Sequence, residues 1–334
     1  MSPVNKPYIG GQAVLEGVMM RSPRSFVVAV RRPDGTIAVR EQDWTTLLPQ
    51  AKFLRWPLMR GAVVLLESLQ NGFSAIKFSA EQAMPAEASA AGGAESQLSQ
   101  TGSNAILAFA TLMMVGLMIL APHMMTWGVS RLFHMALTTS GPAFHLVDGF
   151  FRVAILLGYI LLISRSKEAR RLFQYHGAEH KAIWTYESGM PLTVENAKGF
   201  TTLHPRCGTS FLFVVVMVSV LLHVALLPLI PRMSANELVN QLLLVLIKIP
   251  LAFPVAGIAY ELQRLSAKAN CPRALTFLMR PGMWLQYVTT KEPNEDQLQI
   301  ALLALGRALA REEGTARAVQ GVRVYNDFGI ALGA

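Results

Sequence analysis

The sequence contains few charged residues and few cysteines. Asp, Glu, Lys and Arg make up 15% of its 334 residues, while 52% of the residues are hydrophobic. About a quarter of the residues are charged in soluble globular domains, so this composition argues against a soluble protein and indicates a membrane protein. Only two cysteines are present, and they do not predict a structural disulfide in a cytoplasmic setting. The N-terminus has no apolar core behind its charge, so no cleaved signal peptide is predicted.

Four apolar windows are long enough to cross a membrane as helices, which takes about 20 residues. They cover residues 104–127, 149–164, 210–230 and 239–260. The second window is the shortest and has Arg152 near its start, so a buried core helix is the main alternative for it. We therefore predict a mainly α, polytopic membrane protein with about four transmembrane helices.

Basic residues are distributed unevenly around these windows. They are frequent before the first window and after the second and fourth, whereas the two remaining loops offer Arg131 and Arg232. By the positive-inside rule, both termini and the segment after the second window face the cytoplasm. A net charge of +9 is also typical of nucleic-acid-binding proteins. The basic residues lie beside the apolar windows, however, where anionic lipid accounts for them, so we predict membrane lipids and no nucleic acid as partners.

The segments outside the windows have their own patterns. Residues 25–42 form two alternating runs around Pro-Asp-Gly, which predicts a small N-terminal β-hairpin element. Residues 53–80 have the pattern of an amphipathic helix that either lies on the cytoplasmic membrane face or packs in the fold. A last helix is expected at residues 294–312. The predicted units are a cytoplasmic N-terminal element at 1–80, a flexible Ala/Gly/Ser-rich linker at 81–103, a four-span domain at 104–260 with a cytoplasmic segment at 165–209, and a cytoplasmic helical region at 261–334.

The string YHGAEHKAIWTYESG, at residues 175–189, carries two histidines and two glutamates in an apolar chain. We expect a helix that stops at Gly189, which places His176 and His180 on one face. His-x-x-Glu-His is the inverzincin arrangement, in which the histidines hold zinc and the glutamate, here Glu179, activates water. The pattern is short, so a pair of histidines without a metal is the alternative.

A second string, TTLHPRCGTSF, precedes the third window and places His204 and Cys207 three residues apart on a proline-containing turn. Either or both can complete a tetrahedral site with the two helical histidines. Four protein ligands make a closed, structural zinc site, whereas three leave an open, catalytic position, and the sequence leaves both open. The alternative treats Cys207 as a small buried residue and His204 as a polar group at a helix start.

The string GGQAVLEGVMMRSP, at residues 10–23, is rich in glycine. Its glycine spacing matches neither a dinucleotide-binding fingerprint nor a P-loop, and a tight turn without a function is the alternative. Polar residues of this string and of the two strings above are expected to line a cavity. The predicted cavity-lining residues are Glu16, Arg21, Tyr186, Glu187 and Arg206.

Five strings, GGQAVLEGVMMR, YHGAEHKAIWTYE, LTVENA, HPRCGTSF and PGMWLQYVTTKEP, together resemble the YqhQ-like family of bacterial integral membrane proteins. The resemblance spans nearly the whole chain, and the long Ala/Gly/Ser segment is its chief departure. It implies a location in the bacterial inner membrane and a metal-dependent enzyme whose reaction is not defined. The residues that match the family's polar core are His176, Glu179, His180, His204 and Cys207, with Glu16 and Arg21 in its N-terminal signature.

These observations support three functional hypotheses. The first is a zinc-dependent hydrolase that acts on a peptide or lipid-like substrate at the cytoplasmic membrane face, with Glu179 as general base. The second is a non-catalytic scaffold or assembly factor with a structural metal or a hydrogen-bonded His/Cys core. The third is a transporter, which rests on His223, Lys248 and the prolines of the fourth window and needs four spans to assemble into a homo-oligomer. The predicted zinc ligands of the first hypothesis are His176, His180 and either His204 or Cys207.

Overall fold

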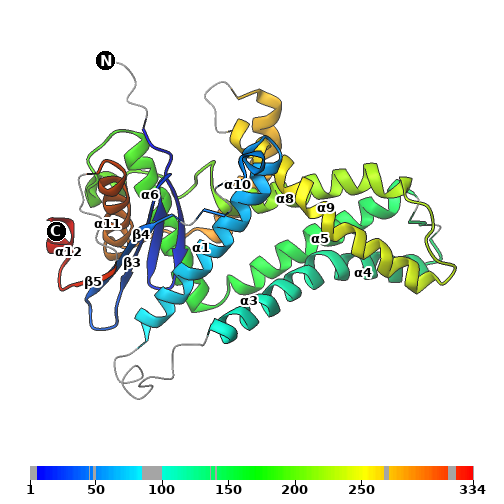
Figure 1. Ribbon diagram of the computed structural model, residues 1–334, viewed down its shortest axis with the longest axis horizontal. Coiled ribbons are helices and arrows are strands. Elements are labelled where there is room, and N and C mark those ends of the chain that lie inside the picture. Colours follow the sequence, from blue (N-terminus) through cyan, green and yellow to red (C-terminus); the bar gives the residue numbers. More distant parts are fainter. Residues whose placement is uncertain are drawn as a thin grey trace.

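A computed structural model describes residues 6–44, 46–47, 50–84, 100–135, 137–139, 141–266, 271–314 and 321–333. A β-sheet with helices on its faces forms one end of the molecule, and a long bundle of helices extends from it (Figure 1). The helical elements are η1 (Lys52–Arg55), α1 (Met59–Ala83), α3 (Gln100–Val115), η2 (Gly116–Leu120), α4 (Ala121–Leu132), α5 (Pro142–Ile163), α6 (Lys167–Glu187), α7 (Val194–Lys198), α8 (Gly208–Leu226), η3 (Leu227–Leu229), α9 (Glu237–Ser266), α10 (Arg273–Thr289), α11 (Glu295–Glu312) and α12 (Phe328–Gly333).

In the described ranges, the sheet has five antiparallel strands in the order β1-β2-β3-β4-β5. The predicted hairpin at residues 25–42 is confirmed, because β3 pairs with β4 along its whole length. Its turn places Gly35 at a φ of 86°, and Asp34 accepts a hydrogen bond from the backbone N–H of Thr36. The strand bounds are β1 (Gly10–Val14), β2 (Gly17–Arg21), β3 (Ser25–Arg31), β4 (Ile37–Asp43) and β5 (Gly321–Tyr325).

Three strands were not predicted from the sequence. The glycine-rich string at residues 10–23 forms the β1–β2 hairpin, with Glu16 at a φ of 52° in its turn. Strand β5 comes from the C-terminal region and pairs with β4. The β1–β2 hairpin was missed because β1 is rich in glycine, a poor strand former. Strand β5 was missed because it has only five residues. The last helix was predicted correctly, since α11 begins after a capping box at Asn294.

Helices cover both faces of the sheet. Alternate strand residues, such as Val27 and Ala29, form one core with α6 and α11. Their neighbours on the strand, such as Phe26 and Val28, form a second core with α1. Because strand side chains alternate between faces, the apolar run of β3 is buried on both sides. Helix α6, which carries the His-x-x-Glu-His string, is therefore held against the sheet.

Within the described part of the chain, the bundle contains four helical stretches that are long and apolar enough to cross a membrane. Their spans are Ala108–Leu132, Pro142–Ile163, Gly208–Leu229 and Glu237–Ser266, so all four predicted windows coincide with helices. The second stretch begins seven residues earlier than predicted, and the fourth continues through both of its prolines. At most 39% of the most apolar window of any stretch is buried, which means that apolar side chains cover the outside of the bundle. Such a surface suits lipid better than water.

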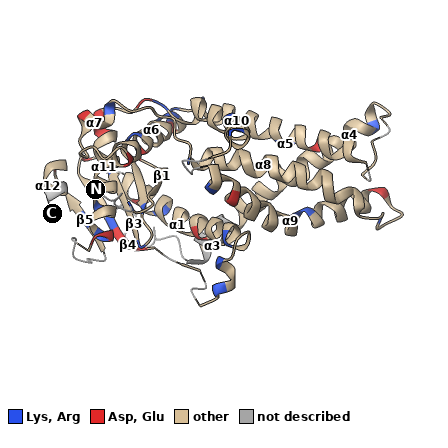
Figure 2. Ribbon diagram, turned by 90° about the horizontal axis from the view of Figure 1, so that it is seen from above, with Lys and Arg blue, Asp and Glu red and all other residues tan. Residues whose placement is uncertain are grey.

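Charged residues follow the same division. Figure 2 shows Lys, Arg, Asp and Glu concentrated around the sheet, with few along the bundle.

The predicted linker at residues 81–103 lies between α1 and α3. Helix α1 reaches into it and ends at Ala83, and helix α3 begins within it at Gln100. Residues 85–99 lie outside the described residues, so the flexible linker there stays a prediction.

Helix α1 packs in the fold through one face, which answers the question that the amphipathic pattern left open. At its start, Arg60 forms an ion pair with Glu261 of α9 at 2.6 Å. Farther along, Ala75 and Phe78 are buried against the sheet. The opposite face exposes apolar side chains such as Leu66, which is 55% exposed. Helix α1 thus connects the bundle to the sheet.

Replacing Gly257 with alanine is expected to separate α1 from α9. A Cβ atom at Gly257 would lie 2.0 Å from the Leu58 carbonyl oxygen, so the backbone must shift. We expect Gly257→Ala to lower the free energy of unfolding by about 1–3 kcal/mol in thermal unfolding of detergent-purified protein. The control is Gly158→Ala in α5, where no described residue other than its helix neighbours comes within 4 Å of the new Cβ. The free energy of unfolding of Gly158→Ala should rise by up to about 1 kcal/mol, because alanine is the better helix former. Equal free energies of unfolding for Gly257→Ala and Gly158→Ala would contradict the prediction.

Candidate metal centre

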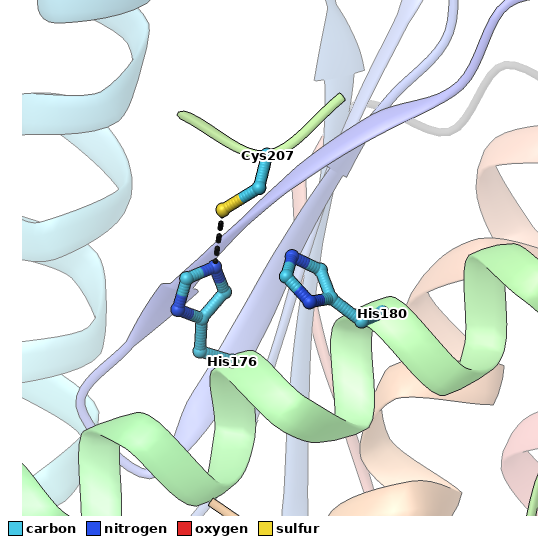
Figure 3. A group of neighbouring side chains, drawn as sticks. All are labelled: His176, His180 and Cys207. Carbon is cyan, nitrogen blue, oxygen red and sulfur yellow. Dashed lines mark hydrogen bonds between the residues drawn. The ribbon is translucent and has the colours of Figure 1, made fainter. Parts of the chain in front are cut away.

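Helix α6 presents two histidines from consecutive turns. The helix starts at Ser166, whose side chain accepts a hydrogen bond from the N–H of Ala169, and it stops at Gly189 with a φ of 72°, as predicted. His176 and His180 project from the same side, and their ring centroids are 4.5 Å apart (Figure 3). The i, i+4 spacing therefore makes the shared face that the sequence predicted.

Cys207 approaches these histidines from a different segment. It is the N-cap residue of α8, and its Sγ atom lies 3.2 Å from Nε2 of His176 (Figure 3). The potential ligand atoms of His176, His180 and Cys207 all lie within 4.8 Å of one another. Cys207 is 4% exposed, so the group is closed off from bulk solvent on that side. Among the described residues, these three form a candidate metal site.

The hydrogen bonds of the two histidines fix which ring nitrogen faces the site. Nδ1 of His176 donates to the backbone carbonyl of Thr289 at 2.8 Å, and Nδ1 of His180 donates to that of Thr202. Because a carbonyl only accepts, both Nδ1 atoms carry the proton, and in the neutral rings both Nε2 atoms keep a free lone pair. Nε2 of His180 is buried and has no hydrogen-bond partner among the described residues. A divalent metal would satisfy it, and such carbonyl contacts commonly orient metal-binding histidines.

Helix α10 holds the Cys207 turn in place through Gln286. The Gln286 amide oxygen accepts from the backbone N–H of His204, and its NH₂ group donates to the His204 carbonyl, both at 2.8 Å. The same NH₂ group lies 2.7 Å from Oγ of Ser210 in α8. Gln286 is fully buried. One side chain therefore fixes the turn and the start of α8 that together place Cys207.

Close backbone contacts bring α6 to the same place. A Cβ atom at Gly177 would lie 2.1 Å from the Lys291 carbonyl oxygen, so only glycine fits there. The N–H of Lys291 also donates to the carbonyl of Phe173 at 2.9 Å. Glycine is less favourable than alanine inside a helix, but at position 177 it allows the end of α10 to reach the histidines.

Glu179 is 5% exposed and lies against strand β1. A Cβ atom at Gly11 would lie 2.7 Å from Cγ and Oε1 of Glu179, so the first glycine-rich string makes room for this carboxyl group. Its carboxyl group forms no hydrogen bond with another described residue. Burial raises the pKa of Glu179, and the nearby His180 and His176 oppose that rise. The result is a carboxyl group that is suited to hold a proton close to the candidate ligands.

Cys207 and His176 influence each other's protonation. Burial lowers the pKa of His176, but the Cys207 sulfur outweighs it and raises the pKa to about 9. Burial likewise raises the pKa of Cys207, yet His176 holds it well below its usual range. The pair therefore favours a thiolate, which is the form that binds a metal or attacks an electrophile.

His204 lies beside this group but is directed elsewhere. Its ring packs on Trp184 and on His180, with centroids 4.8 and 5.6 Å apart. Nδ1 of His204 accepts a hydrogen bond from the N–H of Arg206, and Nε2 lies 3.5 Å from a carboxylate oxygen of Glu187. Burial and the neighbouring His180 lower the pKa of His204 to about 4. It borders the site as a neutral imidazole.

The five predicted cavity-lining residues occupy three places. Tyr186, Glu187 and Arg206 gather at the end of α6, where Arg206 pairs with Glu187 and the Tyr186 hydroxyl donates to a carbonyl of the N-terminal segment. Glu16 instead pairs with Arg171, near the start of α6. Arg21 stacks over the ring of Trp44 at 4.6 Å. Of the five, Glu187 and Arg206 contact His204.

Several residues that support the site were missed in the sequence. They act through backbone carbonyls, an amide or close packing, and no residue type announces such roles. Most of them fall within or beside the strings that carried the family resemblance, which was the available signal. These residues are Gly11, Thr202, Gln286 and Thr289.

Comparison with known proteins gives the chain a family. The model of a family described as "Protein of unknown function (DUF1385)" matches residues 56–311. The chain is also 32% identical over 319 residues to "Uncharacterized protein YqhQ" of Bacillus subtilis (strain 168), and this similarity covers 92% of the chain and 93% of that protein. No solved structure matches. The resemblance to YqhQ-like proteins is thus confirmed, and the chain belongs to the DUF1385 family.

Proposed function

We propose that the protein is a zinc-dependent hydrolase of the bacterial inner membrane, with its site on the cytoplasmic side. One observation carries the proposal. The buried Nε2 of His180 and the Nε2 of the half-buried His176 are directed to one place by Nδ1–carbonyl hydrogen bonds, and they lie together with the Cys207 sulfur. Two imidazoles and a thiolate are a known zinc ligand set, and zinc would supply a Lewis acid that lowers the pKa of a water molecule.

A catalytic site is favoured over a structural one by the number of ligands. Structural zinc sites use four protein ligands, whereas catalytic sites use three and leave one position open. Within the described residues, the grouped ligand atoms come from three side chains. His204, the remaining candidate, accepts a hydrogen bond from the N–H of Arg206 at Nδ1, and its buried Nε2, which has no hydrogen-bond partner among the described residues, lies 3.5 Å from Glu187 and outside the grouped ligand atoms. The scaffold hypothesis with a four-ligand metal is therefore the less supported one.

Glu179 is the proposed general base. Burial raises its pKa, and a raised pKa brings a carboxyl group closer to the range in which it can both take and return a proton. It would accept a proton from the attacking water and pass it to the leaving group. His176 and His180, on the same helix, would hold the ligand positions relative to it.

The site's position supports a substrate that is presented at a membrane. His176 is held by the carbonyl of Thr289 at the end of α10, whose outer side chains Trp284 and Tyr287 are both 63% exposed. Cys207 caps α8, one of the helices apolar enough to span a membrane. A peptide or lipid-like substrate held close to the bilayer would reach this junction. Membrane lipids are the proposed partners, and a homo-oligomer is compatible with the exposed apolar surface.

A second candidate function follows from the Cys207–His176 pair alone. The sulfur lies 3.2 Å from Nε2 of His176 at the N-terminus of α8, and Nδ1 of His176 is oriented by the Thr289 carbonyl. This is the arrangement of an activated cysteine nucleophile with its base and an orienting group. In that case, Cys207 would attack an acyl carbonyl without a metal, and the protonated His176 would give its proton to the leaving group as the acyl bond to that group breaks.

Metal analysis separates these functions. We expect about one zinc per chain in detergent-purified protein, and we expect its loss in both His180→Ala and Cys207→Ala. Glu179→Gln should retain zinc but lose the activity found for any substrate by about 10²-fold or more. His134→Asn, at an exposed histidine with a φ of 49°, is the control and should keep zinc.

Two other outcomes decide against zinc catalysis. If the wild type binds no zinc even after growth with added zinc, and if iodoacetamide labels Cys207 rapidly in a Cys271→Ser background, the cysteine nucleophile is the correct function. If Glu179→Gln keeps full activity on an identified substrate, the proposed role of Glu179 is wrong.

A further inference from the structure

A second polar cluster lies inside the bundle, apart from the candidate metal centre. Lys248 of α9 donates to Oδ1 of Asp148 in α5 at 2.8 Å, and its Nζ lies 3.0 Å from Nδ1 of His123 in α4. Arg152 donates to the other carboxylate oxygen of Asp148 at 3.0 Å. His123, Asp148, Arg152 and Lys248 are each no more than 3% exposed. Ionisable residues at such positions are costly and usually functional.

The cluster carries an excess positive charge. Asp148 is shared by two cations, Lys248 and Arg152. Among the described residues of α3, α4, α5, α8 and α9, the other acidic side chains are Glu237 and Glu261, which pair with Arg232 and Arg60. One buried cation of the cluster is thus left without a carboxylate of its own. An uncompensated charge in a low-dielectric interior is unfavourable, so an anion nearby would stabilise it.

The hydrogen bonds indicate that Lys248 is the protonated partner. The NH₂ group of Gln241 donates to Glu237 at 2.5 Å, so its oxygen is free to accept from Nε2 of His123 at 2.8 Å. With its proton on Nε2, His123 offers a lone pair on Nδ1 to the Lys248 ammonium group. A continuous chain of hydrogen bonds therefore runs from Glu237 through Gln241 and His123 to Lys248.

This chain begins at a pocket at the end of the bundle away from the sheet. The pocket has a volume of about 500 Å³, within the range of small-ligand sites. Trp127 and Arg131 of α4, Arg232, and Glu237 and Gln241 of α9 are among its lining residues. Gln241, at 1% exposed, belongs to both the pocket and the buried cluster.

Arg131 gives the pocket a cation that is free to bind a ligand. Its guanidinium group lies over the Trp127 ring at 5.6 Å and forms no ion pair with a described acidic residue. Arg232 shares Glu237, so the lining has a net positive charge. The surrounding surface at this end is apolar, with Leu132 and Leu229 exposed at 73% and 77%. Positive charge inside an apolar rim suits a ligand with an anionic head and an apolar tail.

We propose that this pocket binds a phosphate-type anion, with Arg131 as its direct contact and the cluster around Lys248 as the positive charge behind it. The anion is the headgroup of an anionic phospholipid or free inorganic phosphate, because the two share the chemistry that Arg131 recognises. The lipid source rests on the membrane location proposed above, whereas the phosphate source does not. Neither depends on zinc at the other site.

Native mass spectrometry of the full-length protein tests the lipid source. The protein is reconstituted into nanodiscs that contain equal amounts of phosphatidylglycerol and phosphatidylcholine, and the lipids that stay bound after its release are identified. We expect bound phosphatidylglycerol to exceed phosphatidylcholine, and Arg131→Gln to reduce that preference about 10-fold, which is about 1.4 kcal/mol. Arg24→Gln, on an arginine of the sheet region whose side chain is 78% exposed, should leave the preference unchanged.

Thermal unfolding in detergent tests the free anion. Added inorganic phosphate should raise the melting temperature of the wild type above that in chloride of equal ionic strength, and Arg131→Gln should lose this shift. A phosphatidylglycerol preference without a phosphate shift assigns the site to a lipid headgroup, and a shift without a preference assigns it to the free anion. If neither effect occurs, or if both persist in Arg131→Gln, the proposal is wrong. Arg131 is exposed, so its substitution should not prevent folding.

Discussion

Asp148→Asn should lower the free energy of unfolding by about 3–5 kcal/mol, which is the usual cost of removing one partner from a buried ion pair. Asp148 is 1% exposed and is the only carboxylate that reaches Lys248 and Arg152 among the described residues. Asparagine keeps the size of the side chain but leaves both cations without a counter-charge. Chemical or thermal unfolding of the detergent-purified protein, followed by circular dichroism, would measure the loss.

A matched control and a double variant sharpen this prediction. Asp34→Asn changes the same chemical group in an exposed hairpin turn, where asparagine can also accept the Thr36 hydrogen bond. It should unfold like the wild type. Asp148→Asn combined with Lys248→Met should regain part of the loss, since one of the two unpaired cations is gone. The charge argument is wrong if the two aspartate variants are equally stable.

Gln286→Leu is expected to damage both the fold and the candidate metal centre. The substitution leaves the buried N–H and C=O of His204 without the partners that Gln286 supplies, at a cost of about 1–3 kcal/mol for each. The turn that places Cys207 would loosen as a result. Loss of such an orienting residue typically weakens metal binding about 10–100-fold, and we expect that decrease in zinc affinity here.

Competition with a chelator measures the zinc affinity of this variant, beside an unfolding curve. Tyr287→Leu is the control, because it introduces leucine at the next position of α10, where the side chain is 63% exposed. Gln286→Glu keeps the acceptor for the His204 N–H but loses both donors. Its zinc affinity should therefore lie between those of Gln286→Leu and Tyr287→Leu. Equal zinc affinities for Gln286→Leu and Tyr287→Leu would show that the amide does not position the site.

The features that could be predicted from the sequence depend on local patterns. Apolar runs located the four long helices, and the Pro-Asp-Gly turn located the β3–β4 hairpin. The spacing of His176 and His180 placed both rings on one face of a helix. Each of these follows from residues that are close together in the chain, where periodicity determines direction.

The missing parts depend on contacts between distant segments. The sequence left His204 and Cys207 as equal candidates, and the structure groups Cys207 with the histidines because Gln286, about 80 residues away, fixes the turn between them. The pairing of β5 with β4 crosses nearly the whole chain and has no local signal. Nor could any pattern show that Gly11 makes room for Glu179.

The pairing of β5 with β4 also constrains how the protein is made. Strands β1 to β4 are synthesised before the bundle helices. Helix α11, which packs on one face of their sheet, and strand β5, which pairs with the β4 edge, both follow the bundle helices in the chain. A ribosome therefore produces the four long helices while the early strands still expose apolar side chains and an unpaired edge. Until the last segments emerge, a chaperone or the ribosome surface would have to shield those strands. Premature termination after α10 would leave the long helices attached to an incomplete, aggregation-prone sheet.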